Sequence, residues 1–212
     1  MKSDTVVWAG LDYSLVRMIG TNDFQVPDMI FPDMLESWNN LFLDERIHEM
    51  AKSLDRRISV DISGVKAKNK TASKSQIIRC PLASDTLQES HIDAQQIAES
   101  IKSYKLENTN GLGLVFVIDR FIEKNQGYSP EDPRQRSNSG RFTSPASGAV
   151  YVVFFDVESR EVISLERQTQ TVKTGGGFRN FWFGVIKRTD SSLGKYRLGH
   201  PHTNDIDWRR NR

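Results

Sequence analysis

Three aspartates stand at the ends of apolar runs, where they could act together on a ligand. Asp12 closes "VVWAGLD", Asp119 closes "GLGLVFVID" and Asp156 closes "AVYVVFFD". Many α/β folds place functional groups at strand ends, and paired carboxylates can transfer protons or bind a divalent cation. The competing interpretation is structural, because aspartate also ends strands and begins turns. For Asp156, which opens the turn "DVESRE", the structural interpretation is sufficient.

A second candidate is the glycine-rich segment "TGGGFRNFWFGVIKR" at residues 174–188. Gly175, Gly176 and Gly177 precede a helical pattern, where backbone amides can approach an anion, and Arg179 follows within the first turn. The spacing matches neither GxxxxGK[ST] nor GxGxxG, the phosphate-binding patterns of two large protein classes. We therefore expect the glycines to form a hinge into a helix, which permits an anion without requiring one.

The apolar residues after the glycines recur with helical spacing. They occupy positions i, i+3, i+4, i+7 and i+8, namely Phe178, Phe181, Trp182, Val185 and Ile186. Such a stripe is typical of a helix that packs on a core. The segment is thus a better indicator of fold than of an active site.

Other kinds of chemistry have less support in the sequence. The four histidines form no HExxH pattern and are expected at the surface, and the single Cys80 excludes an intramolecular disulfide and a cysteine-rich zinc site. The net charge of +2 is too small to indicate a polyanionic partner. Nucleic-acid binding is a weaker alternative, which would use Arg179, Lys187, Arg188 and the tail "DWRRNR". We expect no metal, no cofactor and no nucleic acid.

The elements that must position these residues follow from the apolar periodicity. A long amphipathic helix is predicted over residues 32–55, and a second helix after Asp93. Strands are predicted at 6–13, 58–62, 111–119, 149–157 and 161–171. The strand at 111–119 is apolar on both faces and should be central, whereas the polar strand at 161–171 should lie nearer a sheet edge. The lysine-rich segment 66–76 is predicted to be a solvated loop.

Along the chain, the predicted elements follow the order strand, helix, strand, helix, three strands and helix. The first half has crossover spacing and the second half hairpin spacing, which predicts an α/β fold of α+β character with a single mixed β-sheet and helices packed against it. We expect one domain over residues 1–190, a polar mobile insert at 124–148, and a polar C-terminal tail at 191–212.

The second half of the chain resembles a group of bacterial envelope proteins. In these, a central strand precedes a hairpin with a D-x-x-(T/S)-(G/R)-E turn and an aromatic helix; here the turn is "DVESRE" and the helix "FRNFWFGVIK". The whole order of elements is similar to the N-terminal domain of TolB-type proteins and to periplasmic lipoprotein domains related to CsgG. The likeness covers most of residues 5–188, but the polar insert, the lysine-rich segment and the missing lipobox cysteine depart from those families.

The resemblance implies an envelope location and a role in protein assembly. It implies no catalytic residues for this chain, because those families have no recognised set of them. The start of the chain, which enters a strand after four residues, is expected for a protein from which a leader has been removed; a cytoplasmic protein is the alternative. We therefore expect a non-catalytic periplasmic or envelope domain that binds another protein and has no transmembrane segment. The alternative is a small-ligand binder or hydrolase-like enzyme with its site near Asp12, Asp119 and the glycine turn.

Overall fold

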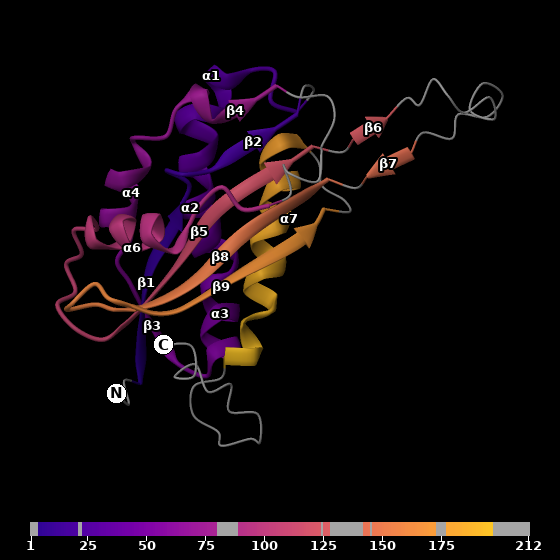
Figure 1. Ribbon diagram of the computed structural model, residues 1–212. Coiled ribbons are helices and arrows are strands. Elements are labelled where there is room, and N and C mark those ends of the chain that lie inside the picture. Colours follow the sequence, from indigo (N-terminus) through magenta and orange to yellow (C-terminus); the bar gives the residue numbers. More distant parts are fainter. Residues whose placement is uncertain are drawn as a thin grey trace.

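The computed structural model describes residues 4–20, 23–79, 89–123, 125–127, 142–144, 146–172 and 177–196. One seven-stranded sheet runs through this part of the chain, with helices on both of its faces (Figure 1). Its first strands pair in parallel and its last two are antiparallel. The predicted fold class, a mixed sheet with helices packed against it, is confirmed.

The sheet is organised around β5 (Leu112–Ile122), which is buried over nearly its whole length. On one edge, β5 pairs in parallel first with β1 (Thr5–Asp12) and then with β2 (Arg17–Ile19). These two strands follow one another along the same edge, separated by the loop 13–16. The prediction that this apolar strand is central is therefore confirmed, whereas β2 was not predicted.

The outer strands complete the sheet on both sides. β8 (Ser147–Asp156) pairs antiparallel with the other edge of β5, and β9 (Val162–Thr171) pairs with β8, so the polar strand lies at the edge as predicted. On the opposite side, β3 (Arg57–Val60) pairs with β1, and β4 (Ile77–Ile78) pairs with β2.

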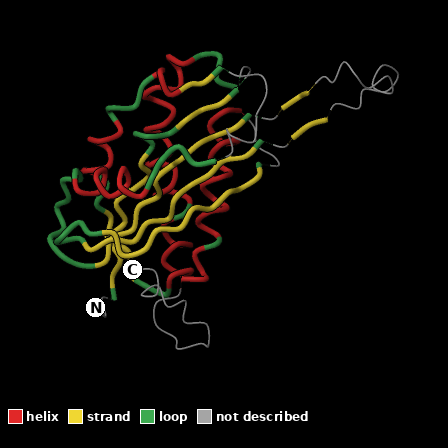
Figure 2. The backbone as a smooth tube through the Cα atoms, in the orientation of Figure 1, coloured by secondary structure: helices red, strands yellow, loops and turns green. Residues whose placement is uncertain are grey.

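One face of the sheet is covered by three helices: α2 (Leu35–Glu45), α3 (Ile47–Leu54) and α7 (Gly177–Ser191) (Figure 2). An aromatic core fills the space between them, in which Trp8 stacks on Phe42 with ring centroids 4.6 Å apart. Within α7, the predicted apolar stripe is confirmed, because Trp182, Val185 and Ile186 are buried and Phe178 and Phe181 pack against the same cluster. The short α1 (Pro27–Met29) and the turns at Ile30–Met34 and Leu193–Tyr196 flank this layer.

The other face carries α4 (Ser63–Asn69) and α6 (Ala94–Lys102), which pack on a smaller apolar cluster. Asp93 caps α6 as predicted: its side chain accepts from the backbone of Gln96, whose side chain in turn accepts from the backbone N–H of Asp93. The two faces of the sheet are thus covered unequally, by a large aromatic layer and by a smaller layer with α6.

Two predictions of secondary structure were wrong, one of a helix and one of a loop. The long helix over 32–55 is interrupted at Arg46, whose backbone leaves helical geometry between α2 and α3 while its guanidinium binds Asp190 of α7. The lysine-rich segment is not a loop throughout, because α4 and a short 3₁₀ turn at Lys74–Gln76 occupy most of it. Buried Val65 and Asn69 give α4 an inner face, which the run of lysines conceals in the sequence.

In the polar insert, β6 (Asn125–Gly127) and β7 (Phe142–Ser144) pair as a two-stranded ribbon. The rest of residues 124–145 lies outside the described residues, and β8 begins at Ser147, inside the boundary predicted for the insert. The mobility of the insert and the division into domain and tail stay predictions.

The close packing of β5 against β8 predicts opposite effects for two glycine-to-alanine substitutions. A Cβ at Gly113 would lie 2.4 Å from Cζ of Phe155, whereas a Cβ at Gly184 in α7 would meet only Val172, at 3.9 Å. We expect Gly113→Ala to destabilise the protein by about 1–3 kcal/mol through overpacking. Gly184→Ala should stabilise it by about 0.5–1 kcal/mol through helix propensity. Denaturant unfolding of both variants measures the difference, and equal effects would contradict this packing.

Candidate functional site

The site begins where β1 leaves its outer neighbour. The pairing of β1 with β3 ends at Trp8, and its register with β5 then shifts across Gly10, which has a φ of +116°. A side chain on Gly10 would be strained in this backbone conformation, and its Cβ would lie 2.9 Å from Oδ1 of Asn39. Glycine is therefore required at this bulge.

Two buried asparagines replace the missing strand beyond the bulge. Asn39 of α2 accepts from the N–H of Leu11 at 2.8 Å and donates to its carbonyl at 3.2 Å. Asn69 of α4 accepts from the N–H of Tyr13 at 2.9 Å and donates to the same Leu11 carbonyl at 2.8 Å. The backbone of residues 11–13 is thus satisfied by side chains, which frees the chain to leave the sheet as the loop 13–16.

Asp12 anchors the same loop from the α6 side. Its Oδ2 accepts from Ser100 Oγ at 2.9 Å and from the Tyr104 hydroxyl at 2.5 Å, and its Oδ1 accepts from the N–H of Ser14 at 2.8 Å. Burial, reinforced by the nearby charge of Asp12, raises the pKa of Tyr104 well above its usual value, so the hydroxyl remains a donor. Asp12 is fully buried, and these contacts give it a structural task.

Asp119 lies in a second irregularity, the register shift between Ile118 and Arg120 of β5. Its Oδ2 accepts from Arg167 Nε at 2.8 Å and from Arg120 Nε at 3.1 Å, and its Oδ1 lies 2.9 Å from His91 Nδ1. Burial alone would raise the pKa of Asp119, but the contacts with His91, Arg120 and Arg167 outweigh it and hold the pKa below the usual value. A charged carboxylate therefore sits inside the protein, paired with two arginines and next to His91.

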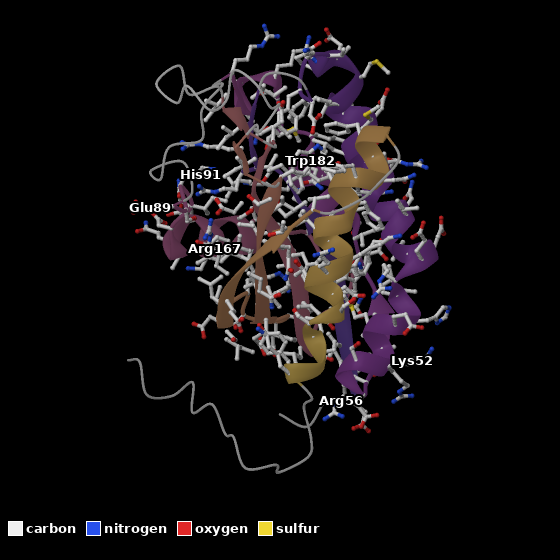
Figure 3. All side chains as sticks on the ribbon, turned by 90° about the vertical axis from the view of Figure 1, so that its right-hand side faces the viewer. Lys52, Arg56, Glu89, His91, Arg167 and Trp182 are labelled. Atoms are coloured by element: carbon white, nitrogen blue, oxygen red, sulfur yellow. The ribbon has the colours of Figure 1, made fainter. Side chains whose placement is uncertain are left out.

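His91 connects this cluster to the loop 13–16. Its Nε2 lies 2.8 Å from the carbonyl oxygen of Leu15 and must donate, because a carbonyl only accepts. The segment that carries His91 is held to β8 by the Tyr151 hydroxyl, which donates to Ser90 Oγ at 2.8 Å. Figure 3 shows His91 and Arg167 together on one side of the sheet and Trp182 of α7 on the other. The expectation that His91 is a surface residue was wrong, since its side chain is only 14% exposed.

A cleft of about 430 Å³ opens beside this cluster, between the loop 13–16, the turn at Lys74–Gln76, β4 and the start of α6. Its apolar lining comes from Leu15, Val16, Ile78 and Ile92. Polar side chains complete it, and the ones that could contact a ligand are Ser14, Arg17, Gln76, His91 and Gln96. Within the part of the chain that the structure describes, no three His, Cys, Asp or Glu side chains are grouped so that they could hold a metal ion.

The residues predicted from sequence fall on opposite faces of the sheet. Asp12 and Asp119 share the α6 face, and Asp12 pairs in register with Val117, two residues before Asp119, yet each carboxylate has its own set of partners. Gly177 and Arg179 begin α7 on the other face, where the carbonyl of Arg179 accepts from Trp38 Nε1 at 2.9 Å. The structure does not bring the start of α7 to the carboxylates. Gly175 and Gly176 lie outside the described residues.

Asp156 has the structural role expected of it, since its side chain accepts from two backbone N–H groups in the turn that it opens. The residues that sequence reasoning missed are Ser14, Arg17 and His91, which line the cleft. No sequence motif links these three residues. They lie on segments far apart in the chain, which come together only when the sheet forms. The available signal was an arginine beside Asp119 in "VIDR", which indicates an ion pair within the strand.

Comparison with known proteins assigns no family to the chain. No protein-family model matches it, and no curated protein matches it. A solved structure described as a "putative neuraminyllactose-binding hemagglutinin homolog from Helicobacter pylori" is similar at 12% identity and a TM-score of 0.29, over 92% of this chain and 79% of that chain. A likeness at this level carries no argument about function. The resemblance to TolB-type and CsgG-related domains finds no support in these comparisons.

The buried ion-pair cluster makes Asp119→Asn a test of the site. We expect this substitution to lower the free energy of unfolding by about 3 kcal/mol at pH 7, because it leaves buried cations without their carboxylate. The pKa of Asp119 is depressed in the folded state, so its stabilisation is present above the unfolded value of about 3.9 and is lost as pH falls through the folded pKa. The difference between the variant and the parent protein should therefore shrink below about pH 4.

Denaturant unfolding between pH 7 and pH 3 measures this dependence. Asp44→Asn, at an exposed position of α2, is the matched control and should leave the stability unchanged at both pH values. A difference between Asp119→Asn and the parent that stays constant down to pH 3 would contradict the charged state assigned to Asp119.

Proposed function

We propose that this protein is a non-catalytic binding domain of the bacterial envelope and that it binds another protein through the open edge of β9. The observation that carries the proposal is the edge itself. In the described part of the chain, β9 pairs with β8 alone, and it runs for ten residues along the border of the sheet (Figure 1). A strand of this length can accept an extended segment of a partner through main-chain hydrogen bonds.

The edge of β9 has little of the protection that isolated edge strands usually carry. The strand contains neither lysine nor proline, and its single irregularity lies near its start, at the register shift opposite Phe154 and Phe155. Its two charged side chains are occupied, because Glu166 accepts from Lys195 and from the Tyr196 hydroxyl, while Arg167 binds Asp119. The last three residues of the strand, Thr169, Gln170 and Thr171, carry uncharged polar side chains that are exposed or half-buried. This end of the edge is suited to strand pairing.

A non-catalytic role is favoured by the state of the two carboxylates. Asp12 and Asp119 are both fully buried. Asp12 accepts hydrogen bonds through both oxygens, and Asp119 accepts from Arg120 and Arg167 through Oδ2 while its Oδ1 faces His91 inside the protein. A general acid or base must reach the substrate proton within hydrogen-bond range, which these two side chains do not do in this arrangement. The hydrolase-like alternative therefore loses the constellation on which it depended.

A site-specific crosslink tests the proposed edge. A photoreactive amino acid at position 171, incubated with an envelope extract, should form an adduct with one partner protein, whereas the same group at exposed position 48 on α3 should not. Thr169→Lys places a charge on an exposed position of the edge and should lower the yield at position 171 about tenfold. This magnitude corresponds to the loss of one or two main-chain hydrogen bonds of about 1 kcal/mol each.

His48→Lys is the matched control, because it adds a lysine at an exposed position of α3, away from β9. Equal yields from Thr169→Lys and His48→Lys would contradict binding at the edge. If the crosslinked product contained two copies of this chain, the edge would mediate self-association, and the proposal of a different partner protein would be wrong.

The envelope location rests on the sequence resemblance and needs its own measurement. Among the described residues, no helix is long and apolar enough to cross a membrane. We expect the native protein to fractionate with the periplasm or the envelope of its source cell. Recovery in the cytoplasmic fraction alone would overturn the location while leaving the binding edge to be judged by the crosslink.

A further inference from the structure

The cleft beside Asp119 combines features that the binding of a partner strand at β9 does not use. It is formed by the loop 13–16, the turn at Lys74–Gln76 and the segment 91–96, on the α6 face of the sheet. Its volume of about 430 Å³ lies within the range of pockets that hold small molecules. Two polar side chains in its lining, Arg17 and Ser14, indicate which ligand it would take.

Arg17 is exposed at the start of β2 and faces a like charge. It is the register partner of Arg120 on the neighbouring parallel strand, so both side chains lie on the same face. Burial lowers the pKa of Arg120, the ion pair with Asp119 opposes this effect, and the charges of Arg167 and Arg17 make smaller contributions that lower the pKa. Like charges at paired positions are unfavourable, and Arg17 has no ion pair or hydrogen bond of its side chain among the described residues.

Ser14 supplies a second, independent indication. The residue is only 7% exposed and lines the cleft, and its Oγ is buried with no hydrogen-bond partner in the described structure. Buried polar groups are almost always hydrogen-bonded, because an unmade bond costs the full desolvation of the group. The backbone of Ser14 is fixed on both sides, since its N–H donates to Asp12 and its carbonyl accepts from Gln76. The hydroxyl is therefore a buried donor without an acceptor at the inner wall of the cleft.

We propose that the cleft binds the oxyanion group of a small organic ligand, a carboxylate or a phosphate. Arg17 lines the cleft and supplies the cationic donor, and an anion bound to it offsets the positive charge that it holds beside Arg120. Ser14 Oγ donates to a second oxygen of the same group. His91 lines the cleft, but its two ring nitrogens lie close to the Leu15 carbonyl and to Asp119, so it is a positioning residue that holds the loop 13–16 rather than a donor to the ligand. Leu15, Val16 and Ile92 provide an apolar wall for the carbon part of the ligand.

Titration of the isotopically labelled full chain, followed by amide NMR, tests the proposal. The probes are sodium phosphate in one arm and sodium succinate in the other, at an ionic strength held constant with sodium chloride. Saturable shifts are expected for amides of residues 14–17 and 91–96. Saturation with phosphate alone indicates a phosphate ester as ligand, and saturation with succinate alone indicates a carboxylic acid; either result supports an oxyanion site.

Three variants separate specific binding from a general effect of charge. Arg17→Gln should weaken binding about tenfold or more, and Ser14→Ala about two- to tenfold, as expected for a charged and a neutral hydrogen bond. Arg188→Gln, an exposed arginine of α7 on the opposite face, should bind as the parent does. Shifts that rise linearly with both anions, or that are equal in Arg17→Gln and Arg188→Gln, would overturn the site.

Thermal unfolding without added anion provides a further readout. If Arg17 and Arg120 repel one another when no anion is bound, Arg17→Gln should melt at the same temperature as the parent or slightly higher, by about 1–2 °C. A lower melting temperature would show that Arg17 stabilises the fold through a contact within the chain, and this result would overturn its assignment to a ligand.

Discussion

The hydrogen bonds from Asn39 and Asn69 to residues 11–13 are the constraint on which the cleft depends. A central parallel strand needs a neighbour on each edge, yet β3 stops pairing at Trp8 and β4 resumes only beside β2. The two amides fill the gap, because an asparagine side chain has the same donor and acceptor as a peptide group. Without them the buried backbone would be unpaired, at a cost of about 1–3 kcal/mol per group. With them, the chain can leave the sheet and form one wall of a cleft.

The two faces of the sheet differ in the chemistry of their buried side chains. The α7 face is filled with aromatic side chains, among them Trp8, Trp38 and Trp182, and its polar groups serve mainly to join helices. The α6 face carries the buried ion pairs around Asp119. A carboxylate kept charged inside a protein costs desolvation that its partners must offset. Here these partners come from β5, β9 and the His91 segment, so the cluster ties the sheet edge to the wall of the cleft.

The sequence predicted those features that depend on periodicity. The apolar run of β5, the stripe on α7 and the Asp93 cap are local patterns with local causes, and each is present in the structure. It did not predict β2, a three-residue strand, or α4, whose lysines hide the buried Asn69. The candidate site was harder to predict from the sequence, because Ser14, Arg17 and His91 come together only after β5 has paired on both of its edges. Asp12 ends β1 as predicted, but the prediction that Asp119 ends its strand was wrong, because β5 continues to Ile122 and Asp119 lies at an irregularity within it. The glycine turn was grouped with these two residues without a signal for which face of the sheet it would cover.

The pairing of β1 with β5 joins residues about a hundred positions apart, as in the register partners Val6 and Leu112. No local hairpin can bring them together, so the chain must close a very long loop before the centre of its sheet exists. Parallel pairing over such separations is associated with slow folding and with a long period in which apolar strands are exposed. The β8–β9 hairpin, by contrast, joins neighbouring residues and can form early, after which β5 can pair with the free edge of β8. During synthesis β1 is made before β5, so it stays unpaired until β5 has also been made.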